Sequence, residues 1–165
     1  MRSILFCACA FFLSSAASAQ DSVIVNQDSS PLQISAYNAA YNPGGTRYST
    51  EGITHRVSLQ NSGSQAVVAY QIRFVSFDAF NEDMGRPLGG VAIETVPVGG
   101  SANGSWNQRA YASFAFEKYG TGVAYVNKVR LADGTVWNAD KEFVLRRLQS
   151  VQSDLTAEIF ETVEE

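Results

Sequence analysis

Apolar and polar residues alternate through most of the chain, in short runs that glycine, asparagine and proline residues separate. Two runs are long enough to fix the period of this alternation, residues 53–59 and residues 68–74. A period of two is typical of a β-strand that buries one face. About seven such runs recur at spacings near ten residues, which predicts a mainly β fold, an antiparallel β-sandwich.

The alternation is interrupted in a few places. It slips at Val75-Ser76, so that Phe77 takes the opposite phase, and a β-bulge or the end of strand pairing would explain this. Asp133-Gly134 is a strong hairpin signal. The other glycine-containing pairs are interpreted as turns, since none is followed by the lysine and helix of a phosphate-binding loop. They are Gly89-Gly90, Gly99-Gly100, Asn103-Gly104 and Gly120-x-Gly122.

The period changes near the C-terminus. Apolar residues recur there every three or four positions, which is the spacing of one helix face, and they are Val144, Leu148, Val151, Leu155 and Ile159. Asp140 is a suitable N-cap. We therefore predict a C-terminal α-helix that frays beyond Thr162. A strand over residues 142–148 is the alternative, because Phe143 and Leu145 also alternate with polar neighbours. The apolar stripe either covers the sandwich or faces a partner.

The N-terminal residues have the pattern of an export signal. Arg2 precedes an apolar run over residues 4–13, and Ala17-Ser18-Ala19 is a signal-peptidase motif. A membrane anchor is the alternative, but it would need about 20 apolar residues. We predict cleavage after Ala19, a periplasmic or secreted location, and no membrane span in the remaining chain.

These patterns predict four segments. Residues 1–19 form the signal peptide, and residues 20–31, which are polar and lack periodicity, form a flexible leader. The β-sandwich spans residues 32–138, and residues 139–165 form the C-terminal helix and an acidic tail.

The charge and the cysteine content limit which partners and which covalent cross-links are expected. Without residues 1–19, eleven basic residues face sixteen acidic ones, so the net charge is −5. An acidic balance argues against nucleic acid as a partner. Both cysteines lie in the predicted signal, so no disulfide is expected in the exported chain.

Few residues suggest catalysis or metal binding. His55 is the only histidine and shares a strand face with apolar residues, which predicts a buried side chain satisfied by the backbone. Asp78, Asn81, Glu82 and Asp83 do not have the spacing of a calcium loop, so we interpret them as a solvated turn. No catalytic residue, metal or cofactor is predicted.

Aromatic side chains offer a different kind of site. Most of them, Trp106 and Trp137 included, are expected to fill a core that has no disulfide. Tyr41 and Tyr48 lie in a mostly polar segment, so they are the candidate ligand-facing pair.

The centre of the chain resembles the FxLYD-type domains. The matching stretch is Asn61-Ser62-Gly63 followed by Val68-x-Tyr70-x-Ile72-x-Phe74-Val75-Ser76-Phe77-Asp78, with Gly85 further on. Ser76 stands at the Leu position and Phe77 at the Tyr position of the family motif. The resemblance covers about half of the chain after the signal. It implies an immunoglobulin-like sandwich in the cell envelope of a prokaryote, with no established activity.

Together these observations predict an exported, non-enzymatic binding or interaction module of the cell envelope. Its expected partner is another envelope protein or a second copy of the chain. The alternatives are an envelope hydrolase that acts on glycan or peptide through paired carboxylates, and a purely structural protein without a ligand.

Overall fold

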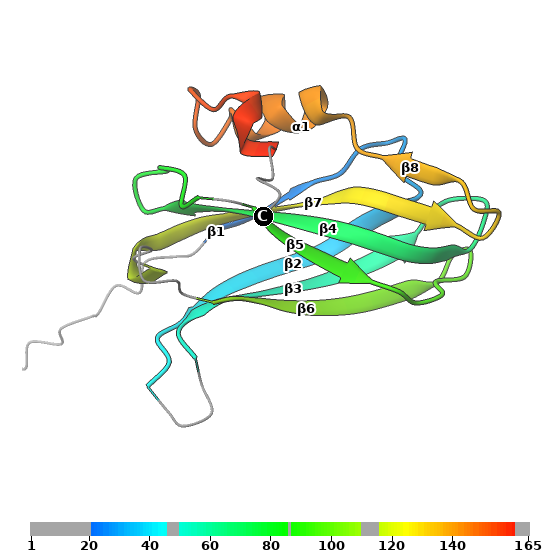
Figure 1. The fold of residues 1–165 in the computed structure, drawn as a ribbon, viewed down its shortest axis with the longest axis horizontal. Coiled ribbons are helices and arrows are strands. Elements are labelled where there is room, and N and C mark those ends of the chain that lie inside the picture. The colour runs from blue at the N-terminus through cyan, green and yellow to red at the C-terminus, as the bar shows by residue number, and fades with distance from the viewer. Residues whose placement is uncertain (1–20, 46–49, 86, 110–115, 161–165) are drawn as a thin grey trace, which may run out of the picture.

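The computed structural model describes residues 21–45, 50–85, 87–109 and 116–160. In this part of the chain two β-sheets face each other and a C-terminal segment packs on the outside of one of them (Figure 1). The five-stranded sheet has the order β1-β7-β4-β5, with β8 also paired to β7. Its strands are β1 (Asp21–Val25), β4 (Val67–Asp78), β5 (Leu88–Ala92), β7 (Tyr119–Leu131) and β8 (Val136–Asn138). The three-stranded sheet has the order β2-β3-β6, from β2 (Leu32–Asn42), β3 (Gly52–Asn61) and β6 (Ser101–Arg109).

The predicted fold class is confirmed, with eight strands where about seven were expected. All pairings are antiparallel except that of β1 with β7, which is parallel. The prediction of a flexible leader over residues 20–31 is wrong for β1. Val25 is buried against the C-terminal segment, and the backbone of β1 pairs with β7 from Asp21 onwards. The residues of β7 that pair with β1 lie about 100 positions later in the sequence, so no local pattern predicts this pairing.

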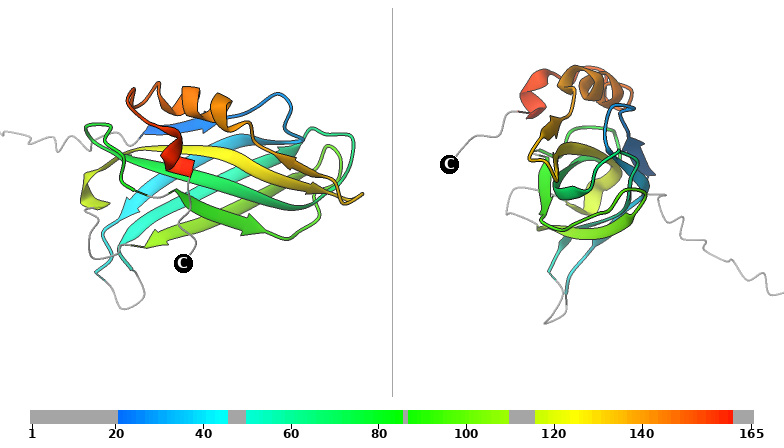
Figure 2. Two further views of the ribbon diagram at one scale, coloured as in Figure 1. Left: turned by 45° about the horizontal axis from the view of Figure 1, so that its top comes forward. Right: turned by 90° about the vertical axis from the view of Figure 1, so that its right-hand side faces the viewer.

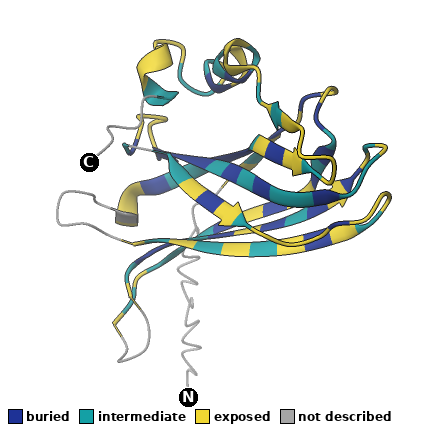
Figure 3. Cartoon of the chain, turned by 45° about the vertical axis from the view of Figure 1, so that its right-hand side comes forward, coloured by how far each residue is buried: buried dark blue, intermediate teal, exposed yellow. Residues whose placement is uncertain are grey.

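Two apolar clusters hold these layers together. The first fills the space between the sheets and contains Ile53, Ile72 and Phe74 among others. The second lies between the five-stranded sheet and the C-terminal segment, and both Val75 and Phe77 belong to it. Strand β4 is therefore buried on both faces along part of its length (Figure 3). No register shift occurs at Val75 or Ser76, so the predicted bulge there is wrong. Val75 and Phe77 point to the outer face of β4, where they pack under the C-terminal segment.

The C-terminal segment is helical over a shorter stretch than predicted. Helix α1 spans Lys141–Leu148, and the carboxylate of Asp140 accepts hydrogen bonds from the backbone of Glu142 and Phe143 at 2.9 and 3.1 Å. The predicted N-cap is thus confirmed and the alternative strand is wrong. The single helix to Thr162 is also wrong, because turns follow Leu148 before the 3-10 helix η2 (Ala157–Phe160). The Ser150 hydroxyl donates to the carbonyl of Arg147 at 2.6 Å in this break. No described helix is long and apolar enough to cross a membrane.

Several predicted turn glycines lie inside strands. Gly90 is in β5 and Gly104 is in β6, and a Cβ atom at either position would overlap the indole ring of Trp106. Gly120 and Gly122 are in β7. The turn interpretation is therefore wrong for these positions, where glycine leaves room for neighbouring atoms. It is confirmed at Gly99 and Gly134, which have φ angles of +69° and +89°.

Gly104→Val is expected to destabilise the fold by about 1–3 kcal/mol, because the new side chain must displace Trp106 from a packed position. Ser105→Val is the matched control, since Ser105 is exposed on the opposite face of the same strand. Urea unfolding monitored by tryptophan fluorescence measures both. Equal stability of the two variants would contradict a close fit of Trp106 against β6.

His55 is buried in a side-chain network between the sheets. Its Nδ1 lies 2.9 Å from the Tyr37 hydroxyl, and its Nε2 lies 3.3 Å from Oε1 of Gln108. The Ser76 hydroxyl donates to the same oxygen at 3.2 Å. His55 is thus buried as predicted, but side chains satisfy it where the backbone was expected to. Burial lowers the pKa of His55 to about 4, against an opposing effect of its hydrogen bond to Gln108.

Candidate binding pocket

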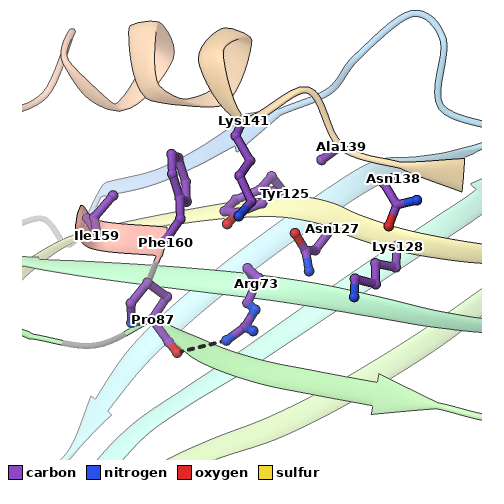
Figure 4. Close-up of a pocket in the computed structure, with 10 residues that line it drawn as sticks. All are labelled: Arg73, Pro87, Tyr125, Asn127, Lys128, Asn138, Ala139, Lys141, Ile159 and Phe160. Carbon is purple, nitrogen blue, oxygen red and sulfur yellow. Dashed lines mark hydrogen bonds between the residues drawn. The ribbon is translucent and has the colours of Figure 1, made fainter. Parts of the chain in front are cut away.

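A pocket of about 180 Å³ opens between the outer face of the five-stranded sheet and the C-terminal segment (Figure 4). Strands β4 and β7 form its floor, and residues at the start of α1 and in η2 form its wall. Figure 2 shows the C-terminal segment, in orange and red, lying over the outside of the sheet that contains β7, in yellow. The lining residues combine cations, amides and rings: Arg73, Pro87, Tyr125, Asn127, Lys128, Asn138, Ala139, Lys141, Ile159 and Phe160. We refer to it as the cationic pocket.

A β-bulge in β7 shapes the floor. Ile72 of β4 is opposite Val126 and Gln71 is opposite Lys128, so Asn127 is an extra residue in β7. Val126 and Val129 both belong to the cluster between the sheets. Asn127 and Lys128 therefore both lie on the outer side, where a regular strand would place only one of them. The Asn127 amide donates to Oε1 of Gln71 at 2.6 Å, which fixes the amide beside the pocket.

Arg73 supplies the cation on the β4 side. It lies opposite Tyr125 of β7 and opposite Gly89 of β5. Gly89 has no side chain to occupy this position, and the guanidinium reaches over β5 to the carbonyl of Pro87 at 3.5 Å. Burial raises the pKa of Tyr125 to about 12, and Arg73 opposes this rise. The phenol of Tyr125 is therefore neutral near pH 7 and keeps its proton for donation.

Lys141 and Phe160 form the opposite wall. The Lys141 ammonium lies 5.9 Å from the centre of the Phe160 ring, a cation–π distance. Phe160 meets Tyr125 edge to face, with 6.5 Å between ring centres and an interplanar angle of 84°. These ring contacts connect the C-terminal segment to β7 and place the Lys141 side chain over the pocket (Figure 4).

The electrostatics of the pocket differ from those of the chain as a whole. The full sequence has a net charge of −4, yet three cations and no carboxylate line the pocket. None of the three cations is ion-paired with a carboxylate in the part of the chain that the structure describes. Guanidinium, ammonium and amide N–H groups are donors that suit phosphate and carboxylate oxygens. The pocket is therefore equipped to bind an oxyanion.

Tyr41, one of the predicted aromatic pair, does not line this pocket. Tyr41 is half-buried on β2, in the other sheet, and its hydroxyl donates to Glu51 at 3.1 Å. Tyr48 lies outside the described residues. Tyr41 packs partly against the cluster between the sheets.

The predicted helix stripe packs inward. Val144, Leu148 and Leu155 are buried against the five-stranded sheet, with Val151 and Ile159 packed beside them. These side chains cover the sheet face, so in this structure they are not the partner-facing surface that was the other possibility. Only Ile159 also lines the cationic pocket.

The acidic turn after β4 has a structural role. One carboxylate oxygen of Asp78 accepts hydrogen bonds from the backbone of Phe80 and Glu82 at 2.8 and 2.9 Å. Within the described ranges, no group of three or more histidine, cysteine or acidic side chains is placed to hold a metal ion.

Sequence reasoning missed the cations of the pocket. They come from three segments, β4, β7 and α1, and no motif joins them. One signal was present in β7, where the apolar residues Val126 and Val129 are three positions apart instead of two. That spacing indicates a bulge, which is common beside functional sites.

Comparisons with known proteins do not indicate a function for this chain. No family model and no curated protein matches the chain. Among solved structures, the Northeast Structural Genomics Consortium target SoR45 aligns with a TM-score of 0.44 and 15% identity, over 66% of this chain and 80% of that one. A hypothetical protein from Peptoclostridium difficile 630 aligns with a TM-score of 0.43 and 14% identity, over 74% of this chain and 93% of that one. The resemblance to FxLYD-type domains therefore stays a prediction.

Proposed function

We propose that this chain is an exported, non-enzymatic binding module that holds an anionic ligand in the cationic pocket. The observation that carries the proposal is the convergence of Arg73, Lys128 and Lys141 on one concave site without a lining carboxylate. Cations that line the same site repel one another, and a bound oxyanion would relieve this repulsion. The pocket volume of about 180 Å³ suits a single phosphate or carboxylate group with a short extension.

Export is the second part of the proposal, and the sequence pattern of residues 1–19 supports it. Strand β1 begins at Asp21, so cleavage after Ala19 would leave the whole strand in the exported chain. Mass spectrometry of the protein recovered from the cell envelope or medium tests this. A mature chain that begins at Gln20 supports export, and an intact Met1 in a cytoplasmic fraction contradicts it.

Binding is tested with citrate and inorganic phosphate as probes. We expect both to perturb the backbone amide NMR signals of Asn127, Lys128 and Lys141. Arg73→Gln is expected to weaken citrate binding about tenfold, which corresponds to about 1.4 kcal/mol for a charge-assisted hydrogen bond. Arg56→Gln is the matched control, because Arg56 is an exposed arginine of β3 in the other sheet.

Two results would count against this function. Citrate affinity that is equal in the Arg73→Gln and Arg56→Gln variants would show that the pocket is not the anion site. Release of products from glycan or peptide substrates incubated with the same protein would support the hydrolase alternative.

A further inference from the structure

The C-terminal segment covers only part of the outer face of the five-stranded sheet (Figure 1). Beyond the cationic pocket, a shallow groove crosses the uncovered part of β4, β5, β7 and β8. Its lining includes Ala69, Gln71, Val91, Lys128, Arg130 and Val136. Lys128 lines both the groove and the cationic pocket, so the two adjoin at this residue.

The strand register shows which residues lie next to one another across the groove. Val91 of β5 is opposite Gln71 of β4, which is opposite Lys128 of β7. Two residues further along β7, Arg130 is opposite Ala69 on one side and Val136 on the other. Lys128 and Arg130 therefore repeat at the two-residue spacing of a strand, about 7 Å, while aliphatic side chains stand beside them.

The composition of the groove is that of a docking surface for an acidic partner. Lys128 and Arg130 are exposed on its floor, while Val91 and Val136, which are 60% and 48% exposed, lie on its two margins, in β5 and β8. No carboxylate lines the groove. Cations repeated along one strand, in a chain of net negative charge, attract an anionic partner and repel a second copy of the chain.

We propose that the groove and the cationic pocket together bind an extended, acidic segment of a partner protein, in which every second residue is acidic. This inference rests on the proposed function and specifies its ligand. An extended peptide places every second side chain on one face at about 7 Å intervals, which matches Lys128 and Arg130. One acidic side chain would enter the cationic pocket beside Lys128, and the next one on the same face would meet Arg130.

The test uses a fluorescent peptide of about ten residues in which glutamate alternates with valine, with fluorescence anisotropy as the readout. We expect the matching glutamine-valine peptide to bind at least about tenfold more weakly. Arg130→Gln is expected to weaken binding of the first peptide about threefold to tenfold. It is expected to leave citrate binding unchanged, because Arg130 does not line the cationic pocket. Arg56→Gln is the control, because Arg56 is an exposed arginine of the other sheet.

Each other outcome overturns the inference in a recognisable way. If the peptide does not bind while citrate still does, the proposed function stands and the peptide ligand is wrong. If Arg130→Gln and Arg56→Gln bind the peptide equally well, the groove is not the docking surface. If vesicles containing anionic phospholipid bind, lose binding in Arg130→Gln, and the peptide does not bind, the ligand is a lipid surface instead.

Discussion

Acidification from about pH 7.5 to about pH 4 is expected to remove about 3 kcal/mol of folding stability through His55 alone. Burial lowers the pKa of this histidine from 6.5 to about 4 in the folded chain. Between these values the unfolded chain binds a proton that the folded chain excludes, so stability falls as the pH falls. The full contribution is present above about pH 6.5 and is lost by about pH 4, at about 1.4 kcal/mol per pKa unit.

The geometry around His55 explains why the proton is excluded. The ring is fully buried and stacks on Phe74, with 4.4 Å between ring centres. Oε1 of Gln108 already accepts from Ser76 and is the group nearest to Nε2, so Nε2 carries the proton of a neutral ring. Nδ1 then accepts from the Tyr37 hydroxyl. A second proton on Nδ1 would break that bond and leave a charge without a counter-ion in the core.

Urea unfolding at a series of pH values measures this effect, and His55→Gln is the comparison. Glutamine can still accept a hydrogen bond from Tyr37 but does not titrate in this range. Carboxylates titrate in both proteins, so the difference between their pH profiles isolates His55. Parallel profiles for the two proteins would show that His55 does not govern the acid sensitivity.

The strands of the sandwich were predictable because their pattern is local. Residues 53–59 alternate in sequence, and β3 buries Ile53, His55, Val57 and Leu59 as expected. Features that depend on contacts between distant segments were not predictable in this way. The backbone of β1 pairs with β7 about 100 residues later in the chain, and its own five residues carry too short a pattern to indicate a strand.

The phase change in β4 shows how a local pattern can be misinterpreted. The slip at Val75 and Phe77 was interpreted as a β-bulge or the end of strand pairing, because a sandwich strand normally buries one face. Both side chains are buried under α1 and η2, so this strand buries both faces and needs no bulge at this point. The cationic pocket follows from the same arrangement, since the segment that covers Val75 and Phe77 also brings Lys141 and Phe160 to the edge of β7. A two-sided apolar strand followed by a C-terminal apolar stripe is therefore a combined signal for a covered sheet.

Leu148→Ala is expected to destabilise the fold by about 2–5 kcal/mol and also to weaken ligand binding. Leu148 is fully buried in the last turn of α1, within the cluster that holds the C-terminal segment on the sheet. Removing its side chain leaves a cavity in that cluster. The residue does not line the cationic pocket, so any effect on binding must come through the position of α1 and η2.

Two measurements separate these effects, and Arg146→Ala is the control because Arg146 is exposed on the same helix. Urea unfolding gives the loss of stability, and citrate titration under folding conditions gives the affinity. Loosening of the C-terminal segment moves Lys141 and Phe160 away from Arg73 and Lys128, so the affinity of Leu148→Ala should fall while that of Arg146→Ala does not. Unchanged citrate affinity in a destabilised Leu148→Ala protein would mean that the pocket forms without the segment, and that β4 and β7 hold the anion by themselves.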